Sequence, residues 1–279
     1  MCGIAGAFGP AAPNSARLED TLARMSRRGP DANGVFQGTL GGRPLTLLHS
    51  RLSIIDLDAR SNQPYAADNC QLIFNGEIYN YVELRDELVA AGCRFRTDSD
   101  TEVIIQPYLH YGPDCVDHFE GMWAFALADM RDGTLLISRD RFGEKPLYYG
   151  LHQGAFLFAS ELKALRSVPG FSPEIDRHAL REYFRWTNVP SPMTIYEGVS
   201  KLPPAHFLRV SDPAEVPEPH PYWSALDTAG NAPPLPEGAD AVDCLSDVLD
   251  RAVHSQMVSD VPLGAFLSGG IDSSSVVAA

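Results

Sequence analysis

The sequence has 279 residues and an ordinary globular composition, with 44% hydrophobic and 21% charged residues. Its 36 acidic side chains outnumber 22 basic ones and give a formal net charge of -14. Such a chain repels nucleic acid and anionic membrane surfaces, so neither is an expected partner. No apolar run approaches the roughly 18 residues that a membrane-spanning helix needs. A globular protein that works away from membranes is therefore expected.

The five cysteines are odd in number and widely spaced, without any Cys-x-x-Cys pair. They are Cys2, Cys70, Cys93, Cys115 and Cys244. Neither a disulfide framework nor a structural zinc site fits this spacing. We therefore expect reduced thiols and a cytoplasmic location.

The first half of the chain predicts a mixed α/β fold with many short strands. Strands are expected at 1–8, 45–49 and 72–74, and helices at 18–26, 80–92 and 101–111. Asn80 followed by Glu83, and Ser99 followed by Glu102, resemble capping boxes at two of these helices. The strand at 72–74 is expected to end at Asn75-Gly76, a dipeptide typical of turns.

The second half predicts hairpins, a connector and the start of another domain. Strands at 122–129, 135–139, 146–151 and 155–159 are separated by short turns, which favours antiparallel pairs. Helices are expected at 160–166, 176–186 and 240–257, and a buried strand at 261–267. The proline-rich stretch 203–236 is typical of a linker. The domains are thus predicted at 1–195 and 239–279, with a connector at 196–238.

The final stretch contains too little for a complete domain. One strand with one and a half helices cannot form a doubly wound parallel sheet. We therefore expect that the sequence is a fragment, cut early in its second domain.

Cys2 has two competing interpretations from its position alone. A small buried apolar residue near a terminus is the ordinary one. The alternative requires removal of Met1, after which Cys2 carries both a thiol and a free α-amine. One residue then holds a nucleophile and a base for its proton. Lipidation is disfavoured, because position 2 is not the glycine that myristoylation needs and no signal sequence precedes the cysteine.

Short strings along the chain resemble the glutamine-hydrolysing asparagine synthetases, which are class II glutamine amidotransferases. They are Met1–Gly6, Arg28–Asp31, His49–Asp56, Asn75–Asn80, Ser138–Gly143 and Ser268–Ser274, in the order of that family. The resemblance implies an α/β fold: an αββα sandwich of the N-terminal-nucleophile class, followed by the truncated start of a PP-loop ATP pyrophosphatase domain. One departure is Arg27, where many members of the family have histidine; its effect on glutamine affinity is left open.

The resemblance also implies roles for eight residues in a glutaminase site. Cys2 would attack the side-chain amide of glutamine, with Asn75 and Gly76 as the oxyanion donors. Arg51 would bind the α-carboxylate, a task that suits a planar bidentate guanidinium. Glu77 and Asp100 would accept from the α-ammonium group, although either alone is more often a surface acid or a helix cap. Leu52 and Ile55 complete the implied glutamine-binding set.

The Gly-rich loop near the end of the sequence is either a simple connection or a second site, one that binds a nucleotide. Glycine N–H groups at a helix N-terminus attract anionic oxygens, yet the Gly-Lys-Ser/Thr ending of a Walker A loop is absent. The string instead resembles a PP-loop, which implies ATP contacts by Leu267, Ser268, Gly269, Gly270, Asp272 and Ser273.

The resemblance further implies the reaction. ATP with Mg²⁺ would activate aspartate as β-aspartyl-AMP, and ammonia from glutamine would displace AMP to form asparagine. No prosthetic group or metal-ligand set is implied, and a homodimer is one compatible assembly. Two alternatives stay open: an amidotransferase that acts on the carboxylate of a sugar, peptide or natural product, and a non-catalytic degenerate module.

Overall fold

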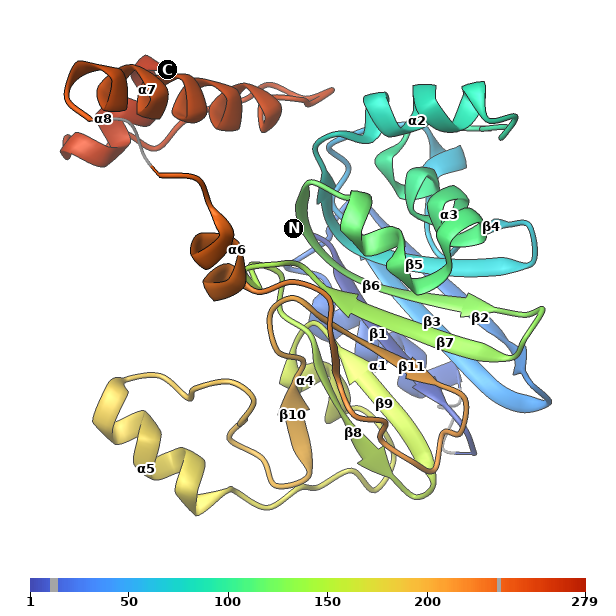
Figure 1. Ribbon diagram of the computed structural model, residues 1–279. Helices are drawn as coiled ribbons and strands as arrows, with labels where there is room; N and C mark the ends of the chain where they lie inside the picture. The colour runs from blue at the N-terminus through green and yellow to red at the C-terminus, as the bar shows by residue number, and fades with distance from the viewer. Residues whose placement is uncertain (11–14, 235–236) are drawn as a thin grey trace.

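Two antiparallel sheets stacked face to face form the body of the protein in the computed structural model, which describes residues 1–10, 15–234 and 237–279 (Figure 1). The first sheet has the order β10-β8-β9-β1-β3-β2 and the second β12-β11-β7-β6-β5-β4. The first contains β1 (Gly3–Phe8), β2 (Ala32–Leu40), β3 (Arg43–Arg51), β8 (Tyr148–His152), β9 (Ala155–Ala159) and β10 (Val199–Lys201). The second contains β4 (Tyr65–Ala67), β5 (Cys70–Ile78), β6 (Gly121–Asp129), β7 (Thr134–Arg139), β11 (His206–Val210) and β12 (His220–Pro221).

The core between the sheets follows from the alternation of side chains along each strand. Ile4 and Phe8 of β1 and Leu45 and Leu47 of β3 face Ile73 of β5 in one fully buried cluster. Intervening residues of the same strands, such as Ala5 and Leu48, face the opposite side. Both faces of the central strands are therefore buried, which requires a helical layer outside each sheet.

Helices supply those outer layers. α1 (Ser15–Met25) and α4 (Leu162–Leu165) pack on the first sheet through Leu18, Met25 and Leu165. α2 (Tyr81–Ala90) and α3 (Asp100–Tyr111) pack on the second sheet through Leu84 and Val103. Two 3-10 helices, η1 (Ala59–Ser61) and η2 (Gly112–His118), lie in loops. The four layers confirm the predicted αββα sandwich, and the predicted hairpins are confirmed as β6–β7 and β8–β9.

Two local expectations in the first half are wrong. Asn75 and Gly76 do not form a turn: they lie inside β5 and pair with Ala124 and Trp123 of β6. The ladder with β6 continues to the end of β5 and overrides the turn preference of the dipeptide. Asn80 makes no side-chain cap on α2; it bonds instead to the backbone at 118 and 120. The cap at Ser99 is present, because its hydroxyl accepts from the N–H of Thr101.

The stretch 196–238 differs from the expected linker. β10, β11 and β12 lie within it, and β11 pairs with β7 over residues 207–210. The sandwich therefore continues at least to Pro221. Five of its prolines fall between these short strands (Pro203, Pro204, Pro213, Pro217 and Pro219), and Pro221 lies within β12, so composition alone is misleading here.

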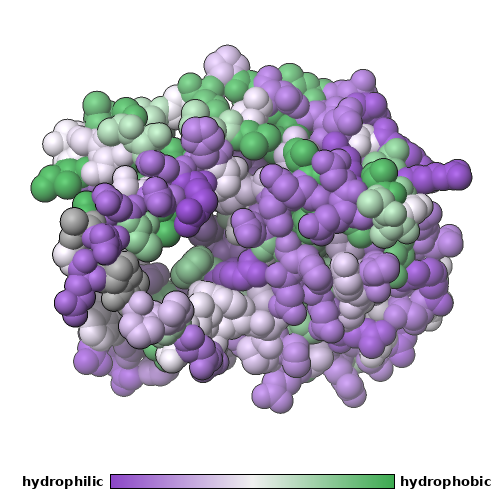
Figure 2. Space-filling view, turned by 45° about the horizontal axis from the view of Figure 1, so that its top comes forward, coloured by the Kyte–Doolittle hydropathy of each residue, from purple (hydrophilic) through white to green (hydrophobic). Residues whose placement is uncertain are grey.

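The last part of the chain is helical and lies beside the sandwich (Figure 1). It contains α6 (Ala225–Asn231), α7 (Ala239–Ser255) and α8 (Ile271–Ala278), while α5 (Arg177–Trp186) projects from the sandwich itself. The strand expected at 261–267 is not formed, since no described strand lies alongside it to pair with. Exposed apolar side chains, among them Leu245, Phe266 and Ile271, gather over α7 and α8 (Figure 2). Within the described ranges, no helix is both long and apolar enough to span a bilayer.

Gly76 provides a test of the β5–β6 pairing. A Cβ at this position would lie 2.1 Å from the carbonyl oxygen of Met122 and 2.8 Å from Cα of Trp123. Backbone atoms cannot move aside as a flexible side chain would, so Gly76→Ala should lower the free energy of unfolding by about 1–3 kcal/mol or more. Gly230→Ala is the matched control, because a Cβ there meets nothing within 4 Å. Denaturant unfolding of the two variants checks this, and equal stabilities would contradict the pairing.

Candidate active site

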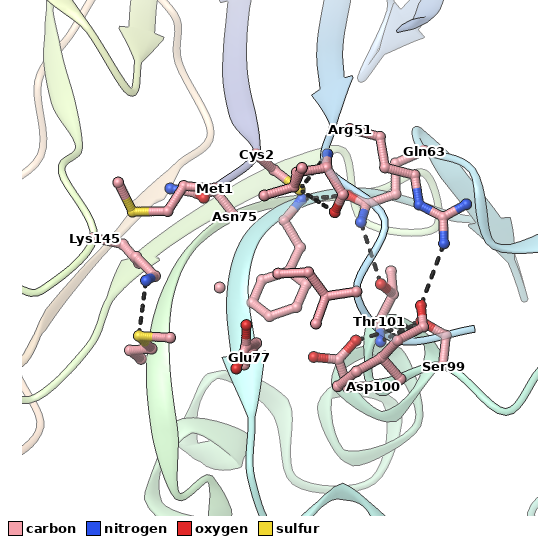
Figure 3. Close-up of a pocket in the computed structure, with 16 residues that line it drawn as sticks. Met1, Cys2, Arg51, Gln63, Asn75, Glu77, Ser99, Asp100, Thr101 and Lys145 are labelled. Atoms are coloured by element: carbon pink, nitrogen blue, oxygen red, sulfur yellow. Dashed lines mark hydrogen bonds between the residues drawn. The ribbon is translucent and has the colours of Figure 1, made fainter. Parts of the chain in front are cut away.

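One pocket at the start of β1 collects the eight residues expected in the glutaminase site. Its walls come from the two residues before β1, the end of β3 and the loop that follows it, β5, the first turn of α3, β6 and the loop before β8. The eight residues are Cys2, Arg51, Leu52, Ile55, Asn75, Gly76, Glu77 and Asp100. Figure 3 shows Cys2 above Asn75, with the carboxylates of Glu77 and Asp100 across the pocket from it.

Cys2 is positioned by the backbone of Leu52 and by the side chain of Arg28. Its Sγ accepts from the N–H of Leu52 at 3.4 Å and lies 3.6 Å from the carbonyl oxygen of the same residue. Its own carbonyl accepts from Nε of Arg28 at 2.8 Å. Burial raises the pKa of the Cys2 thiol. Activation of this thiol therefore needs a base nearby.

The chain's α-amine is the nearest candidate base. Burial lowers the pKa of the Met1 α-amino group, and the positive charges of Arg28 and Lys145 lower it further. Each effect favours the neutral amine, which is the form that accepts a proton. Met1 itself lines the pocket, so its removal would leave the α-amine of Cys2 in the same surroundings.

The string Arg28–Asp31 has a structural role that the sequence did not reveal. Arg28 holds the carbonyl of Cys2, as described above. A Cβ on Gly29 would lie 2.1 Å from the carbonyl oxygen of Ser50, so only glycine fits against β3. The Asp31 carboxylate accepts from the N–H of Ser53 at 2.8 Å. The segment Arg28–Asp31 therefore holds in place both Cys2 and the loop that contains Ser53.

Asn75 is fully buried, and neither its Nδ2 nor its Oδ1 has a partner among the described residues. An unsatisfied buried amide costs about 1–3 kcal/mol. Phe74, its neighbour, is held from both sides: its carbonyl lies 3.1 Å from Nε2 of the buried His49, and its N–H donates to Gln63. β5 thus presents a rigid amide donor into the pocket, next to Cys2.

Arg51 lines the pocket but also builds its wall. Its guanidinium donates to the carbonyls of Ile55 and Asp58 at 3.3 and 3.1 Å, and to Oδ1 of Asn62 at 2.7 Å. It donates to the carbonyl of Asp56 as well. With 5% of its surface exposed, Arg51 therefore organises the loop 52–62, in addition to the ligand contact that the sequence implies.

Glu77 and Asp100 are two acids in the same pocket, of which Asp100 is buried and Glu77 half-buried. Burial raises the pKa of Asp100 to about 7, helped by the charge of Glu77 and opposed by the N–H of Ile78. Burial also raises the pKa of Glu77, opposed by Lys145. Two carboxylates in one pocket disfavour each other's ionisation, and a cationic group placed between them would relieve this.

Lys145 is a pocket residue that the sequence reasoning missed. It is 5% exposed, and its Nζ donates to Sδ of Met122 at 2.7 Å. The Asp140 carboxylate places it, by accepting from the N–H of Lys145 and of Trp123. The available signal was the position of this lysine two residues after the string Ser138–Gly143, which includes Asp140. Figure 3 shows its ammonium beside Met1, on the side of the pocket opposite Asp100.

Gln63 was missed as well. Its Nε2 donates to Thr101 at 3.2 Å and its Oε1 accepts from Phe74 at 2.6 Å. It thereby joins the loop 52–64 to β5 and to the first turn of α3. A single glutamine in a loop carries no pattern that would have identified it.

The residues expected to contact ATP lie elsewhere, outside this pocket. Leu267, Ser268, Gly269, Gly270, Asp272 and Ser273 precede or begin α8. Gly269 has a φ of +80°, and the hydroxyls of Ser268 and Ser273 are 2.9 Å apart. The segment is exposed except at Ser273. In the ranges 1–10, 15–234 and 237–279, no group of three or more His, Cys, Asp or Glu side chains could hold a metal ion.

The layers and the pocket define a class: an αββα two-sheet sandwich whose pocket contains a cysteine directly before its first strand. Residues 1–223 match the glutamine amidotransferase domain family, and residues 245–279 match the asparagine synthase family. The chain therefore belongs to the glutamine amidotransferase domain family.

Named relatives agree with this membership. An asparagine synthetase (glutamine-hydrolysing) of Bacillus subtilis is 39% identical over 99% of this chain and 43% of its own length. A protein of Gibberella zeae named amidase chry2 is 38% identical over 93% of this chain and 38% of its own. The chain thus spans less than half the length of these relatives.

Among solved structures, a glutamine phosphoribosylpyrophosphate amidotransferase of B. subtilis shares the fold. It has a TM-score of 0.54 at 19% identity, covering 75% of this chain and 47% of the other.

The raised pKa of Asp100 predicts a pH-dependent stability. A carboxyl whose folded pKa of about 7 exceeds its ordinary 3.8 stabilises the fold below pH 4, and this contribution is lost as pH rises toward 7. Asp100→Asn keeps an acceptor for Ile78 but cannot ionise. The variant should therefore gain stability relative to the parent protein between pH 4 and 8. Denaturant unfolding across that range measures the difference; a constant difference would contradict the assignment.

Proposed function

We propose that this protein hydrolyses glutamine, with Cys2 as an N-terminal nucleophile after removal of Met1. The observation that carries the proposal is the unpartnered amide of Asn75, held fully buried in the pocket of Cys2. This amide donor costs stability in the resting protein and lies next to Cys2. Such a donor suits an oxyanion that forms only during the reaction. Membership of the glutamine amidotransferase domain family supports the same substrate.

The proposed reaction begins with transfer of the Cys2 thiol proton to its own α-amine. The thiolate attacks the side-chain amide carbon of glutamine, and the carbonyl oxygen becomes an oxyanion that accepts from Asn75 and from the N–H of Gly76. The α-ammonium then gives its proton to the leaving nitrogen, which departs as ammonia, and a γ-glutamyl thioester remains. Water attacks the thioester, releases glutamate and restores the thiol.

Binding of glutamine relies on the charges of the pocket. The α-ammonium of the substrate would lie between Glu77 and Asp100 and relieve their mutual repulsion. Its α-carboxylate would meet Arg51. Leu52 and Ile55 would contact the aliphatic part of the substrate. A zwitterionic amino acid thus matches both signs of charge that the pocket contains.

The finer proposal concerns the acceptor of the ammonia. We propose aspartate, activated by ATP and Mg²⁺ as β-aspartyl-AMP, with the loop Leu267–Ser273 holding ATP. The asparagine synthase match at 245–279 and the name of the B. subtilis relative support it. The fungal relative named an amidase favours a second candidate, in which another carboxylate is amidated. Incubation with ATP, glutamine and aspartate, followed by assay of asparagine and AMP, separates the two.

Substitution of Cys2 by alanine tests the nucleophile. Cys2→Ala should abolish glutamine-dependent glutamate release, while any synthesis driven by added ammonia should persist, because only the nitrogen source is lost. The parent protein should be labelled by diazo-oxo-norleucine at Cys2, as intact mass will show. Continued hydrolysis by Cys2→Ala, or retention of Met1 in the active protein, would overturn the assignment.

Asn75→Ala tests the oxyanion role separately from folding. Loss of one such donor typically lowers kcat by about 10²–10³-fold. Removing an amide with no partner should leave the melting temperature unchanged or higher, because no hydrogen bond is lost. Gln63→Ala is the matched control: both of its amide atoms are bonded, so its melting temperature should fall. An active Asn75→Ala protein would contradict the role.

A further inference from the structure

Two hydrogen bonds connect the segment after α7 to the wall of the glutamine pocket. The N–H of Asp260 donates to the carbonyl of Ile54 at 2.9 Å, and Oδ2 of Asp260 accepts from the N–H of Asp56 at 2.7 Å. Asp260 lies 204 residues beyond Asp56, outside the part of the chain that matches the amidotransferase domain family. A residue outside the sandwich therefore contacts the pocket wall through these two bonds.

The loop that Asp260 contacts is the one that Arg51 organises. Leu52, Ile54 and Ile55 from this loop line the pocket. Arg51 holds the carbonyls of Ile55, Asp56 and Asp58 from the inner side. Asp260 holds the N–H of Asp56 and the carbonyl of Ile54. The loop is therefore fixed by polar contacts from both sides.

Asp56 needs such support. Its φ of +48° lies in the left-handed region, which a residue with a Cβ adopts at a cost. Its carboxylate accepts from Ser61 and from the N–H of Asp98, which fixes the side chain but leaves the backbone N–H to find a partner. The carboxylate of Asp260 is that partner. Its anionic acceptor makes this a charge-assisted bond, which is stronger than a neutral one.

We propose that Asp260 is a positioning residue for the glutamine site, which holds the loop 52–62 in the shape that receives substrate. The inference rests on the proposed glutaminase function. Asp260 touches neither Cys2 nor the reacting atoms, so it acts through Ile54, Asp56 and the pocket wall. Because the chain runs from Asp260 directly to the loop Leu267–Ser273, the contact also joins the two sites expected in this protein.

Asp260→Ala and Asp260→Asn separate this role from a merely structural contact. Asparagine retains an oxygen that accepts from the N–H of Asp56, whereas alanine does not, and both retain the backbone bond to Ile54. In Asp260→Ala the KM for glutamine should rise about five- to tenfold, as expected for one lost charge-assisted hydrogen bond, with kcat within about twofold. Asp260→Asn should have a KM for glutamine close to that of the parent protein. Asp250→Ala, which removes an exposed carboxylate from α7, is the matched control and should leave both constants unchanged.

Hydrogen exchange of the loop supplies a readout that does not depend on turnover. Amides at 52–62 should exchange faster in Asp260→Ala than in the parent protein or in Asp260→Asn, while those of α3 should not change. An unchanged KM and unchanged exchange in Asp260→Ala, or equal losses in both variants, would overturn the inference. A parent protein that does not hydrolyse glutamine overturns the proposed function instead, and the exchange experiment still tests the contact.

Discussion

The register of β1 against β3 is the constraint on which the site depends. Gly3 pairs with Ser50, and Ile4 pairs with His49, so Cys2 comes to lie beside Arg51 and Leu52. The same register places Ile4 and Phe8 between the sheets. A shift by one residue would move those side chains to the outer face and carry Cys2 away from its bonds with Leu52. The hydrophobic core therefore fixes the position of Cys2, although Cys2 contributes little to the core itself.

In the second sheet, the pairing of β5 positions pocket residues in the same way. Its nine residues pair with β6 throughout, which buries Ile73 between the sheets and leaves Asn75 and Glu77 on that same face near the end of the strand. Two polar side chains follow Ile73 on that face of β5, so the core ends where the pocket begins. His49 and Gln63 tie Phe74 to the first sheet and to the neighbouring loop. The donor is thus held by the part of the molecule that is most rigidly packed.

Much of this could be predicted from the sequence, and the failures have physical causes. Strand periodicity, hairpin turns and the Ser99 cap are local features, and they predicted most elements. The eight glutaminase residues could be proposed only by resemblance, because Arg51 is brought to Cys2 by the pairing of β1 with β3, and Asp100 by the stacking of the two sheets. The prediction of a turn at Asn75-Gly76 was wrong, because these residues pair with Ala124 and Trp123 of β6, which lie far along the chain. Lys145 was missed because only the contacts of Asp140 show which way its loop presents it.

Several charged and polar groups of the pocket are only poorly stabilised by their neighbours in the protein. Asp100 and Glu77 oppose each other's ionisation, Lys145 is buried against a thioether, and the amide of Asn75 has no partner in the part of the chain that the structure describes. Each arrangement costs stability in a low-dielectric site. Arg51 is the exception, because the carbonyls of the loop 52–62 already bond to it. A carboxylate that binds Arg51 must therefore share it with the loop, so the affinity for substrate depends on how firmly that loop is held from its outer side. Asp260 provides that hold, and the pocket wall is consequently a property of both halves of the chain.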